Sequence, residues 1–159
     1  MKRITTLTVL CLIGLFGTSL AGIEINTSTG LTLTGEPLAL HGFDAVAYFT
    51  DGAAKLGKAE FSVAHKGATY RFVSQSNKRM FEQNPSAYLP QYGGYCAYGT
   101  FKGKKFDGDP RLFKVVDGKL YFNLNPAVYE LWLEDIPGHI RKADENWREI
   151  RDKAPDDLW

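Results

Sequence analysis

The pattern that most constrains the fold of this chain occurs twice: two strand-like runs joined by a turn, followed by a helix. Each turn contains a glycine, which readily adopts the positive φ that a tight hairpin needs. Both pairs of runs are rich in β-branched and aromatic residues. The sequence therefore predicts two β-hairpins, formed by residues 60–65 and 68–73 around Lys66-Gly67, and by residues 112–116 and 120–122 around Asp117-Gly118.

A helix is expected after each hairpin. Ser74 or Ser76 can cap the first helix, and Asn125 can cap the second, with Pro126 in its first turn. A last helix opens near Pro137, since apolar residues recur there at helical spacing. These residues are Ile140, Ala143, Trp147 and Ile150. Trp132 and Trp147 are interpreted as core residues rather than as a ligand cage.

The 159 residues are enough for one compact domain with a core and too few for two. We predict an α+β fold of two hairpin-and-helix units with a C-terminal helical segment. The expected organisation is a signal peptide at residues 1–21, an extended lead-in at 22–35, the folded domain at 36–150 and a frayed tail at 151–159. Alternation of apolar and polar residues at 23–26 and 31–34 suggests either a lead-in or short edge strands.

The N-terminus has the order of a secretory signal peptide. Lys2-Arg3 precedes an apolar stretch of about 13 residues, and small Ser19 and Ala21 suit cleavage after Ala21. That stretch is shorter than the roughly 20 residues of a membrane-spanning helix, so no stable membrane insertion is expected after cleavage. The mature protein is predicted to be periplasmic or secreted.

Cleavage would leave a single cysteine, Cys96, because Cys11 lies within the signal peptide. No internal disulfide is then available, although exported proteins commonly use them. An odd thiol in such a protein is buried, paired between chains, reactive or metal-binding. Stability must come from packing, and aromatic residues, 13% of the chain, supply large side chains for a core.

The charge balance argues against a nucleic-acid partner. The formal net charge is +1 over the whole chain, whereas nucleic-acid-binding domains normally carry a strongly basic face. Lys102, Lys104 and Lys105 form a small basic cluster, but Asp107 and Asp109 follow at once. The cluster is interpreted as a solvated loop, and the sequence identifies no protein partner.

The most unusual segment lies between the two predicted units, at residues 90–99. It contains three tyrosines, three glycines and Cys96 within ten residues. Glycines allow the backbone to approach a neighbour closely, while tyrosines surround the thiol. We therefore predict a functional cleft here. Its candidate ligand-binding residues are Asp44, Tyr48, Tyr92, Tyr95 and Cys96.

Several strings of residues resemble exported bacterial YHS-domain proteins over roughly residues 36 to 148. They are Gly42 to Phe49, Asn84 to Tyr88, Gln91 to Ala97, and Asp109-Pro110. The YHS module also looks like cysteine-bearing modules attached to heavy-metal and copper transport ATPases. The resemblance implies metal handling as a candidate role.

The chain departs from that metal-associated pattern at three cysteine positions. Where a cysteine follows an Asp-Pro-Val run in those modules, Ala47 follows Asp44-Ala45-Val46 here. The cysteine pair that flanks the module's helix is replaced by Val73 and, approximately, Asn77. Soft metals are held by several thiolates or imidazoles, so the usual site is missing.

A different metal site would use Cys96 with His41, which immediately precedes the Gly42 to Phe49 string. A Cys/His pair can bind Cu(I) or Zn(II), and the family resemblance makes copper or zinc the first choice. His65 and His139 are expected at the surface. The leading hypothesis is thus an exported accessory protein that binds a small ligand or a metal ion, centred on Cys96.

Two alternatives remain open. Cys96, His41 and Asp44 have the side-chain types of a nucleophile, a base and an orienting group, as a thiol-dependent enzyme or redox protein would need. Asp44 also suits a simple turn or cap role. In the third interpretation the protein is a structural interaction module, and the Cys96 thiol is buried.

Overall fold

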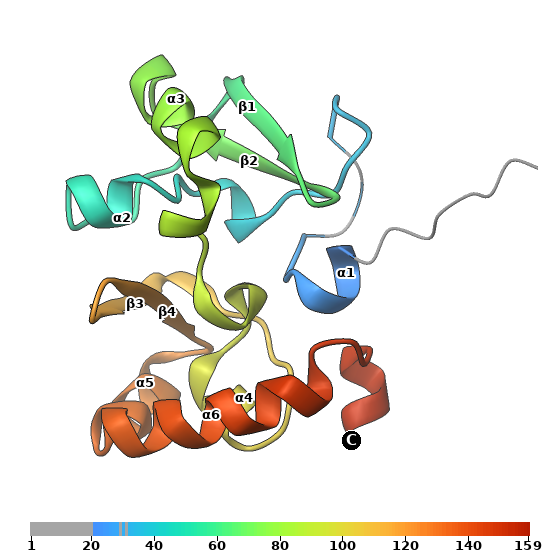
Figure 1. The fold of residues 1–159 in the computed structure, drawn as a ribbon, viewed down its shortest axis with the longest axis vertical. Helices are drawn as coiled ribbons and strands as arrows, with labels where there is room; N and C mark the ends of the chain where they lie inside the picture. Colours follow the sequence, from blue (N-terminus) through green and yellow to red (C-terminus); the bar gives the residue numbers. More distant parts are fainter. Residues whose placement is uncertain (1–20, 29, 31) are drawn as a thin grey trace, which may run out of the picture.

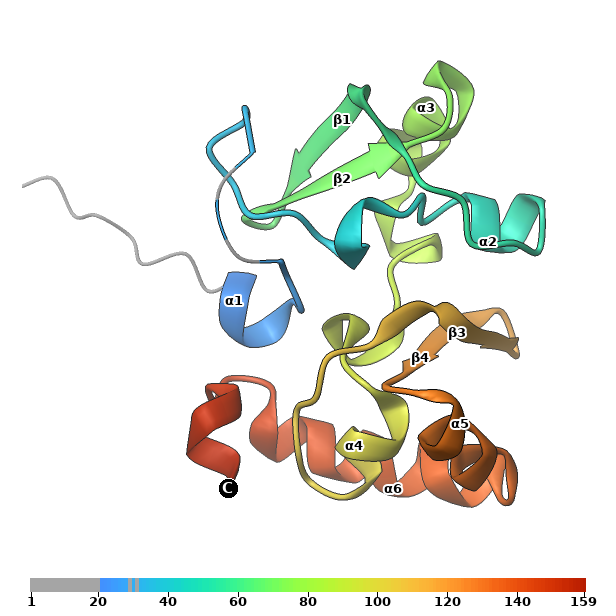
Figure 2. The ribbon, with the colours of Figure 1, turned by 180° about the vertical axis from the view of Figure 1, so that it is seen from behind.

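The computed structural model describes residues 21–28, 30 and 32–159, so residues 1–20 of the predicted signal peptide lie outside the described residues. The molecule consists of two stacked units (Figure 1). One is built from the helices and strands between residues 47 and 83, and the other from those between residues 97 and 150. The first helix, α1 (Ala21–Glu24), lies at one side between the units in both views (Figures 1 and 2).

Both predicted hairpins are present. Antiparallel strands β1 (Lys58–His65) and β2 (Ala68–Phe72) form the first, and β3 (Asp109–Val116) and β4 (Lys119–Asn123) form the second. Lys66 and Gly67 have φ values of 50° and 77°, and Asp117 and Gly118 have 49° and 72°. Two consecutive positive φ values are typical of the type I′ turn, whose twist matches that of the strands.

The helices follow the predicted caps. The Ser74 side chain accepts a hydrogen bond from Asn77 N at the start of α3 (Gln75–Gln83), and the Asn125 side chain accepts one from Val128 N at the start of α5 (Pro126–Leu133). The last helix, α6 (Ile136–Ile150), begins one residue before Pro137 and is capped by Asp135. The predicted α+β class is confirmed.

The repeat extends beyond the hairpins to the segments that precede them. Leu40, His41 and Gly42 all have positive φ, as do Tyr92, Gly93 and Gly94. Each triplet is followed, two residues on, by a side chain that accepts a hydrogen bond from backbone N–H, Asp44 or Cys96. A short helix comes next in each case, α2 (Ala47–Thr50) or α4 (Ala97–Phe101). The Tyr/Gly-rich segment is therefore the counterpart, in the second unit, of residues 40–49.

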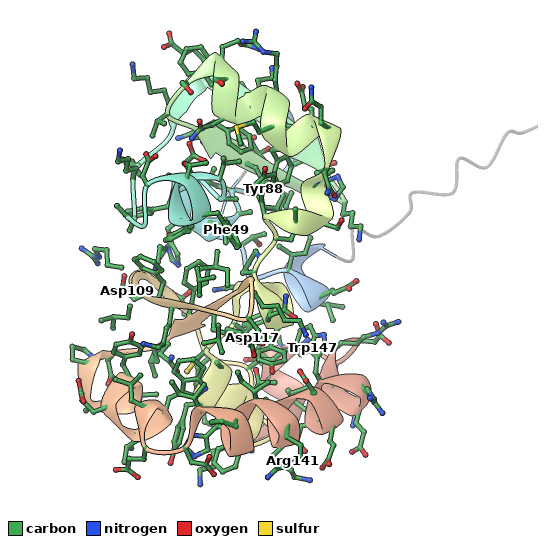
Figure 3. All side chains as sticks on the ribbon, turned by 60° about the vertical axis from the view of Figure 1, so that its left-hand side comes forward. Phe49, Tyr88, Asp109, Asp117, Arg141 and Trp147 are labelled. Carbon is green, nitrogen blue, oxygen red and sulfur yellow. The ribbon has the colours of Figure 1, made fainter. Side chains whose placement is uncertain are left out.

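Each unit has its own core. The first cluster contains Tyr48, Phe72 and Phe81 together with Phe122 from the second hairpin. The second cluster forms around Trp132, which is fully buried, and Tyr92. Figure 3 shows Phe49 and Tyr88 in the first unit, where their ring centroids are 5.7 Å apart. Because Phe122 joins the first core, the two units share packing and are held together by it.

Two expectations about the ends and loops are corrected. The edge strand predicted at residues 23–26 is wrong, because Ile23 and Glu24 belong to α1; the one at 31–34 includes Leu31, which lies outside the described residues. Within the predicted tail, Pro155–Leu158 form a short 3-10 helix. Lys105, assigned to a solvated loop, is 3% exposed. Within the described part of the chain, no helix is long and apolar enough to span a membrane.

Candidate functional site

The Tyr/Gly-rich segment forms a 3-10 turn, Gln91–Gly94, that meets the N-terminal segment. Gly93 has a φ of 62°, and a Cβ atom there would collide with the backbone carbonyl of Glu24. Asn26 N donates to Gly93 O at 2.9 Å. Glycine is thus required both for the left-handed backbone and for the close approach. The turn thus carries Tyr92 and holds the N-terminal chain against Gly93.

A pocket of about 290 Å³ lies where this turn, the first hairpin and α6 meet. Its apolar wall includes several aromatic rings, and its polar groups come from four separate parts of the chain. Figure 3 shows Trp147 projecting from α6 on the side that faces the first unit. The lining residues are Glu24, Ile25, Lys66, Tyr70, Ser86, Leu89, Pro90, Gln91, Tyr92, Gly93, Asp144 and Trp147. We refer to this cavity as the central pocket.

Tyr92 and Asp144 form a partly buried polar contact in the central pocket. The Tyr92 hydroxyl donates to Asp144 Oδ1 at 2.8 Å. Burial raises the pKa of Tyr92 well above its ordinary value, and the hydrogen bond to Asp144 and its charge add to the rise. The phenol therefore stays a neutral donor throughout the physiological range, and it fixes the orientation of the carboxylate.

Behind the pocket, Lys105 is buried between the rings of Tyr95 and Trp147, with Nζ 5.2 Å and 5.1 Å from the two ring centroids. Its ammonium donates to the carbonyl oxygens of Ile23, Arg151 and Lys153 at 2.5 to 2.7 Å. Burial lowers the pKa of Lys105 to about 8. This lysine therefore connects the N-terminal segment to the end of α6. Both of these elements contribute residues to the lining of the pocket.

Cys96 is fully buried and acts as the N-cap of α4. Its sulfur accepts from Gly99 N at 3.3 Å and lies 3.7 Å from Asn123 Oδ1. Burial raises the pKa of the Cys96 thiol, and this effect outweighs backbone hydrogen bonds that act in the opposite direction. A buried thiol with a raised pKa has the character of a structural cysteine rather than a nucleophile.

Asp44 and Tyr48, also predicted as ligand-binding residues, are buried with internal partners. The Asp44 carboxylate accepts from the backbone N–H groups of Val46, Ala47 and Val73 and from Asn77 Nδ2. The Tyr48 hydroxyl donates to Pro110 O at 2.9 Å. The turn role considered for Asp44 is thus the one in the structure, since its carboxylate accepts from N–H groups two and three residues on.

His41 lies at the surface, and its side-chain partners differ from those of Cys96. Its Nε2 lies 2.8 Å from Asp107 Oδ1, and its Nδ1 lies 3.4 Å from Ser28 Oγ. The structure therefore gives the two predicted metal ligands different partners. Among the described residues, no group of three or more His, Cys, Asp or Glu side chains is arranged to hold a metal ion.

The other two histidines also differ from expectation. The His65 ring is half-buried against Phe81, with centroids 5.7 Å apart, and His139 Nδ1 lies 2.9 Å from Trp132 O. Neither is the exposed residue that its position in the sequence suggested.

Of the predicted site residues, Tyr92 lines the central pocket. Tyr95 is outside the lining, but its ring contacts Lys105, which also contacts the lining residue Trp147. Three further lining residues were not predicted as site residues. Asp144 and Trp147 look like ordinary residues of an amphipathic helix, and Glu24 lies in the predicted lead-in. Their convergence depends on how α6 and the N-terminal segment pack, and no local pattern encodes that.

Comparisons of the chain with protein-family models, curated proteins and solved structures found no match.

Proposed function

We propose that this protein is an exported accessory protein of the YHS type that binds a small ligand in the central pocket. The pocket itself carries the proposal: it is concave, walled mainly by apolar and aromatic side chains, and contains a few convergent polar groups. Tyr92, one of its lining residues, belongs to the Tyr/Gly-rich segment at residues 90–99 that is the most unusual part of the sequence. The leader-like N-terminus supports export, and the resemblance of residues 36 to 148 supports the YHS assignment.

A copper or zinc role has less support than ligand binding. It would need Cys96 and His41 to meet at one ion, whereas the Cys96 sulfur contacts Gly99 and Asn123, and the His41 ring contacts Asp107 and Ser28. The thiol-enzyme alternative is weakened by the burial of Cys96. The proposal therefore places the ligand beside Tyr92 and not at the sulfur.

The test is a small-molecule screen by thermal shift on the purified protein, with Kd values of the hits measured by calorimetry. Ser86 is an exposed residue of the pocket lining, so Ser86→Trp should fill the entrance without disturbing the core. Ser76→Trp, at an exposed position of α3 outside the lining, is the matched control.

We expect the hits to bind the wild type and Ser76→Trp alike and to bind Ser86→Trp at least about tenfold more weakly, since the new indole occupies the ligand's volume. Circular dichroism verifies that both variants are folded. A screen without hits, or hits that bind both variants equally, would overturn the proposal.

A further inference from the structure

Among the charged groups that line the central pocket, the negative ones outnumber the positive ones. Glu24 and Asp144 contribute two carboxylates, and Lys66 contributes one ammonium. Lys66 is exposed on the turn of the first hairpin, whereas Asp144 is half-buried on α6. Because a half-buried charge is less screened by water than an exposed one, the carboxylate at Asp144 dominates the interior of the pocket.

The tyrosines around the pocket respond to this negative charge. The pKa of Tyr70 is raised by burial and by the charge of Glu24. Burial and the charge of Asp144 raise the pKa of Tyr121 to about 12, and Asp144 acts in the same direction on Tyr92. The field of both carboxylates therefore reaches the walls of the pocket.

Other cations lie near the pocket but outside its lining. Arg141 and Arg148 line a neighbouring hollow that also includes Asp144, and Lys105 lies on the ring of Trp147. The Lys105 ammonium is satisfied by three carbonyl oxygens, and burial lowers its pKa, an effect that the charge of Glu24 partly offsets. The Tyr92 hydroxyl engages one oxygen of Asp144, Oδ1. A ligand that approaches Asp144 therefore meets a carboxylate already oriented by Tyr92.

We propose that the ligand of the central pocket is a small organic amine with an apolar body. This inference rests on the proposed function. The ammonium group would lie at Asp144 with Glu24 near the entrance, and the body would pack against Trp147, Tyr70 and Leu89. An ammonium next to a partly buried carboxylate gains a charge-assisted hydrogen bond, and the apolar walls accept the rest of the molecule. The volume of about 290 Å³ restricts the ligand to the small end of the range for such sites.

Three probes of one shape test the charge preference: benzylamine, benzyl alcohol and benzoate, each titrated by calorimetry at low and at physiological salt. We expect benzylamine to bind about tenfold or more tightly than benzyl alcohol and benzoate to bind most weakly. Asp144→Asn keeps an acceptor for the Tyr92 hydroxyl but removes the charge. It should weaken benzylamine about tenfold and leave benzyl alcohol unchanged.

Two control variants separate the local charge from the overall charge. Glu145→Gln removes an acid of the same helix that lies outside the pocket lining, and it should leave benzylamine binding unchanged. Lys66→Gln removes the one positive charge of the lining, so benzylamine should bind equally well or more tightly.

Equal binding of the three probes, or a preference for benzoate, would overturn the amine inference. If the probes bound without a preference for benzylamine but Ser86→Trp abolished their binding, the proposed ligand-binding function would stand. If benzylamine failed to bind while the screen gave other pocket ligands, the amine inference would again be wrong and the function would survive. Failure of every compound would refute both.

Discussion

Cys96 occupies, in the second unit, the position that Asp44 occupies in the first. Asp44 N donates to Lys55 O at 2.8 Å, and Cys96 N donates to Phe106 O at 2.9 Å. Each side chain follows a left-handed triplet and accepts a hydrogen bond from backbone N–H at the start of a short helix. The cysteine thus stands where the first unit has a carboxylate, and its retention has a structural explanation as a buried cap.

Unequal losses of stability are expected when the side chains of Asp44 and Cys96 are removed. Asp44→Ala leaves four donors without their acceptor in a site that is 0% exposed, so the free energy of unfolding should fall by about 3 kcal/mol or more. Cys96→Ala should cost about 1 to 2 kcal/mol for the lost cap and a small cavity. Urea denaturation measures both, and equal losses would contradict the comparison.

Alkylation of Cys96 should be slow in the folded protein. The thiol is buried and its pKa is raised, so the thiolate forms at a higher pH than in an ordinary cysteine. Mass spectrometry after iodoacetamide treatment should show labelling that rises with unfolding in urea. When the labelling rate of the native protein is plotted against pH, the midpoint of the curve should lie above the ordinary thiol pKa. Rapid labelling at neutral pH would instead support the thiol-enzyme alternative.

Gly93→Ala should open the wall of the central pocket. Gly52 has the same φ of 62° with no heavy atom within 4 Å of an added Cβ, so Gly52→Ala measures the backbone strain alone, about 1 to 2 kcal/mol. At Gly93 the Cβ also collides with the backbone of Glu24. We expect a larger loss of stability and earlier proteolysis of the N-terminal segment. Equal effects of the two substitutions would show that the close approach is unimportant.

The burial of Lys105 predicts a pH dependence of stability. Its pKa is about 8 when folded and 10.5 in the reference state, so between these values the unfolded chain binds more protons. This lysine therefore contributes stability that increases as the pH rises from about 8 toward 10. Lys105→Met should lower stability at neutral pH, because three carbonyl groups lose their donor. Its stability should also rise less than that of the wild type from pH 8 to pH 10, as measured by denaturant titration, and identical slopes would contradict the assignment.

The elements with local signals could be predicted from the sequence. The two I′ turns need residues that tolerate positive φ, and Lys66-Gly67 and Asp117-Gly118 supply them. Ser74 and Asn125 have the side-chain oxygens that cap helices. These patterns span a few residues each, so tertiary contacts do not override them.

The site was harder to predict because its contacts join distant parts of the chain. Lys105 looked like part of a charged loop, yet its partners are Ile23, Arg151 and Lys153. Asp144 and Trp147 follow the spacing of any amphipathic helix, and the pairing of Asp144 with Tyr92 arises only when α6 packs beneath the 3-10 turn. The equivalence of Asp44 and Cys96 could not be recognised from the sequence, because aspartate and cysteine are chemically dissimilar residues.

The contact of the N-terminal segment with Gly93 and Lys105 has a practical consequence for work with this protein. Glu24 and Ile25 belong to the lining of the central pocket, so an affinity tag or fusion partner joined just ahead of Ala21 would begin beside the binding cavity. Such an attachment could block entry or contribute side chains of its own. Binding assays are best made with an untagged N-terminus.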